Sequence, residues 1–132
     1  MYVGQQSAGA YQRTGVETQV LEADSHRLIL LLFSGLLQRL RLAEACVIKG
    51  ELGRKAKAAS EAGAIIGSLS ASLDFRAGGD IAQRLESIYE YCAHRLVQAN
   101  AHNNAAAFAE VAQLIGEIRS AWVAIRVSEA EQ

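Results

Sequence analysis

Residues 26–40 read HRLILLLFSGLLQRL, and apolar side chains fill most of this run. With the residues that follow, it forms a stripe at the spacing of one helix face: Leu28, Leu32, Leu36, Leu40, Ala43 and Val47. Ile29, Phe33 and further leucines fall outside the stripe, so the first half of this helix is apolar nearly all round. Such a helix must be covered on more than one side. The run is shorter than the roughly 20 apolar residues of a bilayer span, so no membrane insertion is expected.

Three further helices follow the same pattern. Their predicted core residues are Ala59, Ala62, Ile66, Leu69 and Leu73 in the second, Ile81, Leu85, Ile88, Cys92, Leu96 and Ala99 in the third, and Phe108, Val111, Ile115, Ile118, Trp122 and Ile125 in the fourth. The first helix is expected to begin at Asp24 or Ser25, because either side chain can cap it. Glycine or asparagine marks the turns between helices, at Gly50, at Gly78–Gly79 and at residues 100–104, where Asn103 or Asn104 caps the last helix.

The composition agrees with an all-α fold. The chain of 132 residues is 51% apolar but only 6% aromatic, and it contains no proline to interrupt a helix. We therefore predict an antiparallel up-down four-helix bundle over residues 23–127, with a flexible N-terminal arm at residues 1–22 and a frayed tail at residues 128–132. The arm is either a disordered terminus or a segment whose scattered apolar residues bind a surface.

Residues that carry catalysis or bind metals do not occur at a usable spacing. The chain has no Glu-x-x-His motif of the kind found in di-iron bundles, and its two cysteines match no metal or redox spacing. Glu86, Glu90 and His94 share one helix face, which is either a solvated face or a metal site. His26 weakly resembles the histidine of a phosphotransfer bundle but lacks its sequence context. We predict no enzyme activity, no metal and no cofactor.

Charge and small residues leave two further features open. The net charge of −1 gives no global positive field, so no nucleic acid partner is expected. A loose basic group that includes Arg54, Lys55 and Lys57 is either an ordinary charged bundle end or the mark of an acidic partner. Small residues recur along the second helix and allow either close packing within the bundle or a groove for a partner helix: Ala56, Ser60, Gly63, Gly67 and Ser70.

The chain also carries an ordered set of residues over nearly its whole length. The densest part is Ser72-Leu73-Asp74, Gly78-Gly79-Asp80-Ile81-Ala82, Leu85, Tyr89-Glu90-Tyr91, Arg95-Leu96, Ala99-Asn100 and Asn103. Before and after it come Tyr2, Ala10-Tyr11, Val16-Glu17, Leu28-Ile29, Leu32-Phe33, Gly35, Val111, Leu114, Ile118 and Ala121-Trp122. In order and spacing, this set resembles the signature of the flagellin export chaperones, the FliS family. The chain departs from that signature at residues 22–25 and at Ser34, where the family has an acidic residue.

The resemblance implies a four-helix-bundle chaperone of the cytoplasm. Such chaperones bind the C-terminal region of unpolymerised flagellin, prevent its premature assembly and deliver it to a component of the flagellar export gate. A client segment that folds on binding needs a long apolar groove. The arm would cover that groove when no client is present, and a homodimer would also bury it. The N-terminus shows no basic segment followed by an apolar one, so no secretory signal is expected.

On this basis we select candidate residues for client binding and for the lid. The client-binding candidates are Leu32, Phe33, Leu36, Gly63, Ile65, Gly67, Leu69, Tyr89, Tyr91, Leu96 and Asn100, and the lid candidates are Tyr11, Val16, Val20 and Leu21. Tyr89 and Tyr91 point in different directions on one helix, so at most one of them belongs to the core, and an exposed one suits an anchor for a client. Asn100 serves either a client backbone or its own turn. A helical adaptor for another client and a phosphotransfer bundle are the alternatives.

Overall fold

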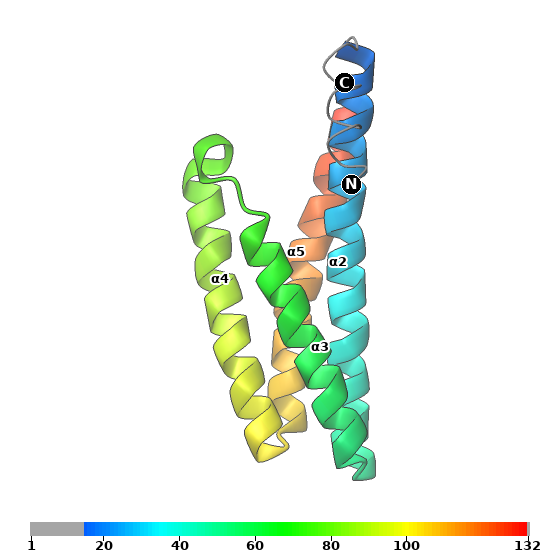
Figure 1. Ribbon diagram of the computed structural model, residues 1–132, viewed down its shortest axis with the longest axis vertical. Helices are drawn as coiled ribbons and strands as arrows, with labels where there is room; N and C mark the ends of the chain where they lie inside the picture. The colour runs from blue at the N-terminus through cyan, green and yellow to red at the C-terminus, as the bar shows by residue number, and fades with distance from the viewer. Residues whose placement is uncertain (1–14, 132) are drawn as a thin grey trace, which may run out of the picture.

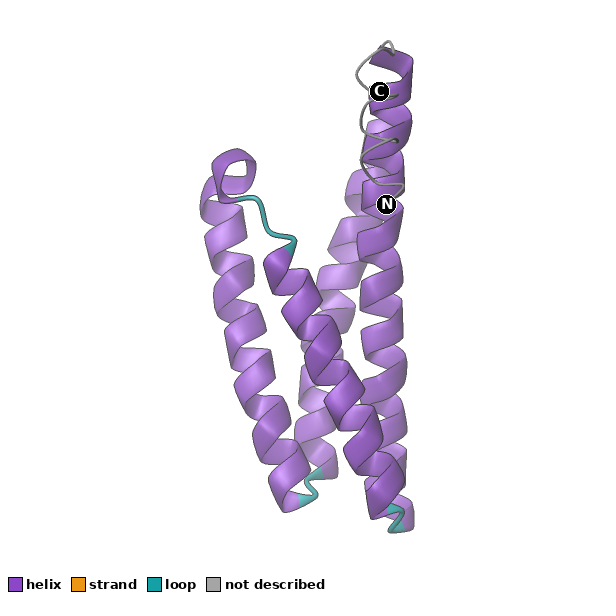
Figure 2. Ribbon diagram, viewed as in Figure 1, coloured by secondary structure: helices purple, strands orange, loops and turns teal. Residues whose placement is uncertain are grey.

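The computed structural model describes the backbone of residues 15–131 and the side chains of residues 25–125. Within that part the chain forms four helices and no strand: α2 (Gly15–Lys49), α3 (Leu52–Ala71), α4 (Phe75–His102) and α5 (Ala105–Glu131). Helices that follow one another run antiparallel, as Figure 1 and Figure 2 show. The α2 helix contacts α3 and α5, and α4 contacts the same two helices. The predicted all-α antiparallel four-helix bundle is confirmed.

The two outer helices extend further than expected. The expected start at Asp24 or Ser25 is wrong, because α2 begins at Gly15. Residues 16–23 include no glycine or proline, and adding turns to an existing helix requires no new nucleus. Residues 15–22 of the predicted arm are therefore helical, while residues 1–14 lie outside the described part. The α5 helix likewise continues to Glu131, through most of the predicted tail at residues 128–132.

The predicted turns form at the expected residues at one end of the bundle. Gly50 ends α2 with a φ of 76°, and Asn103 ends α4 with a φ of 51°. Both angles lie in the left-handed region that often terminates helices. Asn104 then caps α5, because its Oδ1 accepts a hydrogen bond from the Ala107 backbone N–H at 3.1 Å. We call this end, which holds the α2–α3 and α4–α5 turns, the lower end.

The upper end holds the α3–α4 turn and differs from the prediction. Asp74 Oδ1 accepts hydrogen bonds from the backbone N–H groups of Arg76 (3.0 Å) and Ala77 (3.1 Å), so α4 begins at Phe75, before the expected Gly78–Gly79 turn. Gly79 then interrupts the helix with a φ of 50° and a ψ of −123°, a conformation that a side chain strongly disfavours. The turn expected at Gly78–Gly79 is thus a kink that lies one helical turn after the start of α4.

Apolar packing follows the predicted stripes at the lower end but not at the upper end. Leu36, Leu40 and Ala43 of α2 are fully buried, with Cys92, Phe108 and Ile115 opposite them. The upper members of three predicted core stripes are instead exposed: Leu28 by 61%, Ile81 by 68% and Ile125 by 48%. Their assignment to the core is wrong.

Two physical reasons account for the exposed upper members. A strict four-residue spacing turns by about 40° per step around a helix, so Leu28 leaves the buried face while Phe33 enters it. In addition, α4 leans away from α5 towards the α3–α4 turn, as Figure 1 shows. Neighbouring helices therefore do not cover the upper ends of the apolar stripes.

Alanine substitutions at two glycines should change the free energy of unfolding in opposite directions. Gly79→Ala should lower the free energy of unfolding by about 1–3 kcal/mol, because alanine disfavours the φ and ψ of that kink. Gly67→Ala should raise it by about 1 kcal/mol, since Gly67 is exposed within α3 and an added Cβ meets no atom within 4 Å. Urea unfolding followed by helical circular dichroism measures both. Equal effects of the two substitutions would contradict the kink.

Candidate functional site

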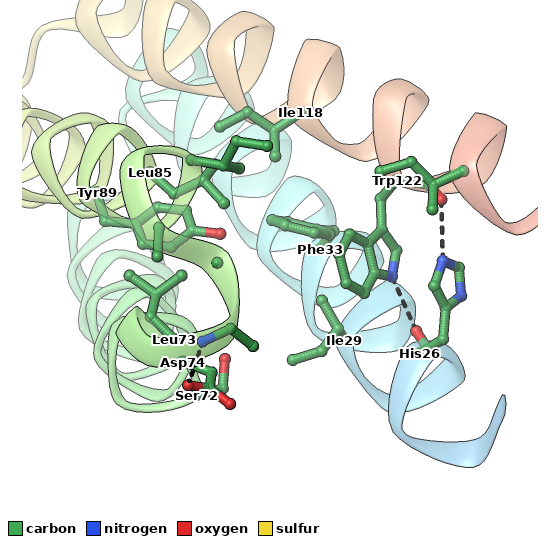
Figure 3. A pocket seen from close by; sticks show the side chains of 15 residues that line it. His26, Ile29, Phe33, Ser72, Leu73, Asp74, Leu85, Tyr89, Ile118 and Trp122 are labelled. Atoms are coloured by element: carbon green, nitrogen blue, oxygen red, sulfur yellow. Dashed lines mark hydrogen bonds between the residues drawn. The ribbon is translucent and has the colours of Figure 1, made fainter. Parts of the chain in front are cut away.

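An apolar cavity of about 560 Å³ lies at the upper end of the bundle. It is lined by His26, Ile29 and Phe33 of α2, by Ser72, Leu73 and Asp74 of the α3–α4 turn, by Ala77, Gly78, Ile81, Ala82, Leu85 and Tyr89 of α4, and by Ile118, Trp122 and Ile125 of α5. We call this cavity the upper groove. Figure 3 shows that its walls come from two sides, with α4 facing α2 and α5. Its volume lies within the range of known ligand pockets.

The floor of the upper groove is buried and its mouth is exposed. Phe33 and Tyr89 form the floor and are almost entirely buried. Ile81 and Ile125 lie at the mouth, where no helix of the described part covers these exposed apolar side chains. An occupant that covered them would gain roughly 25 cal/mol for each Å² of apolar surface removed from water. The groove is therefore suited to an apolar segment of another chain or of this one.

A reciprocal pair joins α2 to α5 at the edge of the groove. His26 Nε2 donates a hydrogen bond to the Trp122 carbonyl oxygen at 2.9 Å, and Trp122 Nε1 donates one to the His26 carbonyl oxygen at 3.0 Å. The two rings also stack, with centroids 4.4 Å apart and planes 7° apart, as Figure 3 shows in part. Three contacts between residues far apart in the chain hold this wall in place before any occupant binds.

Tyr89 places a hydroxyl group in the groove. In Figure 3 its ring extends from α4 towards α2 and α5, with the oxygen at the inner end of the groove. Burial raises the pKa of Tyr89 to about 12, with a smaller contribution from nearby Cys92. The hydroxyl is therefore neutral and protonated over the physiological range.

The aliphatic client-binding candidates, together with Phe33 and Tyr89, fall into three groups. Phe33 and Tyr89 line the upper groove. Leu36, Leu69 and Leu96 are buried in the core between the helices. Leu32 and Ile65 are partly buried against that core. The structure thus brings only two of the predicted apolar residues into one cavity.

The small residues of α3 lie in different surroundings, as two of its glycines show. A Cβ added at Gly63 would lie 3.7 Å from Leu96 Cδ2, so this position faces α4 within the bundle. Gly67 is exposed with open space above it. Of the two interpretations, close packing within the bundle fits Gly63, and neither packing nor a lined cavity is found at Gly67.

Tyr91 and Asn100 make contacts between helices. As predicted, only one tyrosine of the pair is core, and Tyr91 is exposed. Its hydroxyl donates to Glu110, which also accepts a 2.8 Å bond from Arg95 Nε, and these two bonds lower the pKa of Glu110. Asn100 accepts two bonds from Lys55 Nζ, at its backbone oxygen (2.9 Å) and at Oδ1 (2.8 Å).

Much of the basic group is engaged within the fold. Lys55 is 7% exposed and bonded to Asn100, so it ties α3 to α4 rather than meeting an acidic partner. Arg54 pairs with Glu51 at 2.7 Å. Lys57 stays exposed. The lid candidate Tyr11 lies outside the described residues, and Val16, Val20 and Leu21 belong to the part of α2 whose side chains are not described.

Several groove residues were assigned to the core or left without a role by the sequence pattern. The helical spacing places Ile81, Leu85, Ile118, Trp122 and Ile125 in core stripes, and none of them is among the client-binding candidates. The signal in the sequence that could have identified them is that three apolar stripes continue to the same end of the bundle.

Ser34, one of the departures from the family signature, accepts a 3.0 Å hydrogen bond from Arg119 Nε and so keeps a polar contact with α5.

The metal and phosphotransfer alternatives receive no support from the geometry. Among the described side chains, no three His, Cys, Asp or Glu residues come close enough together to hold a metal ion, and Glu86, Glu90 and His94 are no exception. His26 is occupied by its contacts with Trp122. None of the helices in the described part combines the length and apolar content of a membrane span.

Comparison with known proteins gives one consistent result. The chain matches the family described as flagellar protein FliS over residues 7–129. It is 39% identical over 112 residues to the flagellar secretion chaperone FliSB of Pseudomonas aeruginosa, a match that covers 85% of this chain and 89% of that protein. It is 40% identical over 114 residues to the FliS of Salmonella typhimurium (86% and 84% covered) and 32% identical over 113 residues to that of Bacillus subtilis (86% and 80%).

Removing the histidine at the groove wall should weaken the fold. We expect His26→Ala to lower the free energy of unfolding by about 1–3 kcal/mol, because it removes a stacked ring and leaves the Trp122 carbonyl without its donor. His94→Ala, an exposed histidine of α4, should change it by less than about 0.5 kcal/mol. Urea unfolding compares the two. A loss of equal size in both variants would argue against the reciprocal pair.

Proposed function

This chain belongs to the FliS family of flagellar proteins, and on that basis we propose that it is a cytoplasmic export chaperone specific for flagellin. Family membership makes it a flagellar secretion chaperone and not an enzyme. The proposal adds the client and the steps. The chain binds the C-terminal region of unpolymerised flagellin, prevents premature assembly and assists delivery to the flagellar export gate.

The upper groove is the observation that carries this proposal. Apolar side chains of α4 and α5 at its mouth, Ile81 and Ile125, have no partner within the described bundle. A client segment with apolar side chains covers them and completes the packing that the bundle leaves unfinished. Because such a segment loses conformational freedom on binding, a preformed wall such as the His26–Trp122 pair limits the ordering cost to the client side.

The N-terminal arm is proposed to cover the same groove in the absence of client. The α2 helix begins at the upper end (Figure 1), and its residues His26 and Ile29 line the groove, so residues 1–14 precede a helix that forms one wall of it. Residues 1–14 contain Tyr2, Val3 and Tyr11, apolar side chains of the kind that an apolar groove accepts. Arm and client then compete for one surface.

Co-expression with the flagellin of the same organism tests the main proposal. We expect a one-to-one complex with full-length flagellin and none with flagellin that lacks its C-terminal region. Failure to bind either form would overturn the flagellin assignment and favour an adaptor for another client. Sedimentation of the chain alone measures its oligomeric state, and so shows whether binding fails because a client-free homodimer buries its own groove.

A matched pair of α4 variants locates the binding site. Ile81→Asp should weaken flagellin binding at least about tenfold, because it places a charge at the mouth of the apolar groove. Val97→Asp serves as the control, since Val97 is exposed to 67%, nearly the same as Ile81, but does not line the groove. Calorimetry measures both dissociation constants. Equal weakening would place the client elsewhere.

Deletion of residues 1–14 tests the lid and leaves α2 whole. The truncated, client-free protein should bind more of an apolar fluorescent dye than the full chain, because its groove is uncovered. The same deletion combined with Ile81→Asp should show a smaller increase if the dye enters the groove. Unchanged dye binding after the deletion would count against a covering arm.

A further inference from the structure

Each polar side chain that lines the upper groove makes at least one contact of the fold, with one exception. His26 and Trp122 bond each other. The Ser72 hydroxyl donates to the Leu69 carbonyl oxygen at 2.7 Å, and Asp74 Oδ1 caps α4. The exception is Tyr89, which lines the groove and whose hydroxyl has no hydrogen-bond partner among the described residues.

The surroundings of this hydroxyl make its lack of a partner consequential. Tyr89 is 2% exposed, and the residues nearest the floor of the groove, Phe33 and Leu85 among them, are apolar. In the empty groove, water can bond the hydroxyl. An occupant that fills the groove expels this water, and the hydroxyl then either bonds the occupant or stays buried without a partner.

We propose that the Tyr89 hydroxyl is a specificity determinant of the groove, which selects an occupant that presents a hydrogen-bond acceptor among its apolar side chains. This inference rests on the proposed chaperone function, because flagellin is the occupant considered. The acceptor is a backbone carbonyl oxygen or a side-chain oxygen of the client. The hydroxyl acts as the donor, since burial keeps it protonated at physiological pH.

The preference for one occupant over another follows from whether the Tyr89 hydroxyl keeps a hydrogen-bond partner in the complex. An occupant with an acceptor satisfies the hydroxyl, whereas a purely apolar occupant leaves a buried donor without a partner. The difference corresponds to roughly 5- to 150-fold in the dissociation constant. A site built in this way rejects a purely apolar segment, which a wholly apolar groove accepts equally well.

The experiment compares wild-type protein with Tyr89→Phe, which removes the hydroxyl and keeps the ring. Flagellin is one ligand, and diphenylhexatriene, a hydrocarbon dye without hydrogen-bonding groups, is the other. Tyr89→Phe should weaken flagellin binding at least about fivefold and leave dye binding equal or tighter. Ser87→Ala is the control, because it removes an exposed hydroxyl from the same helix that bonds the Gln83 carbonyl oxygen and does not line the groove; it should change neither affinity.

Each outcome decides between the two proposals. If wild-type protein does not bind flagellin, the proposed function fails and the inference fails with it. If wild-type protein binds and Tyr89→Phe binds flagellin as tightly or more tightly, the inference is overturned while the function stands. Loss of dye binding in Tyr89→Phe would mean a collapsed groove, and a role of Tyr89 in shaping the groove would replace the hydrogen bond.

Discussion

Each of the four described helices presents an apolar face that must be covered, and the bundle covers those faces along only part of their length. At the lower end, Leu36, Leu40 and Phe108 are enclosed on all sides. At the upper end, α4 leans away from α5, and the same stripes continue into a cavity. The groove is therefore no addition to the bundle. It is a part of the core that the four described helices leave uncovered.

Polar contacts hold both ends of this arrangement. At the lower end, Lys55 reaches across from α3 to the last turns of α4 and bonds Asn100 twice. At the upper end, His26 and Trp122 join α2 to α5, and Asp74 caps the turn that frames the mouth. These bonds fix the helices around the groove, so the apolar surface stays open without the molecule losing its shape.

The sequence predicted the bundle, two of its three turns and much of the lower core, because those depend on local signals. Gly50 and Asn104 act within a few residues of themselves, and helical spacing identifies faces such as that of Leu36 and Leu40. The exposure of Ile81 and Ile125 depends instead on how far two helices diverge, which periodicity within one helix does not contain. Family resemblance supplied the class of client, while the groove residues emerged only when α2, α4 and α5 were placed together.

The stacked pair at the groove edge also has a spectroscopic consequence. Trp122 is the only tryptophan in the chain, and its ring touches both the cavity and the imidazole of His26. Indole emission depends on the polarity around the ring and on quenching by adjacent groups. Filling the cavity changes the first, and any shift of α2 against α5 changes the second. The unlabelled protein thus carries a single built-in optical reporter with which the capture and release of a client can be timed.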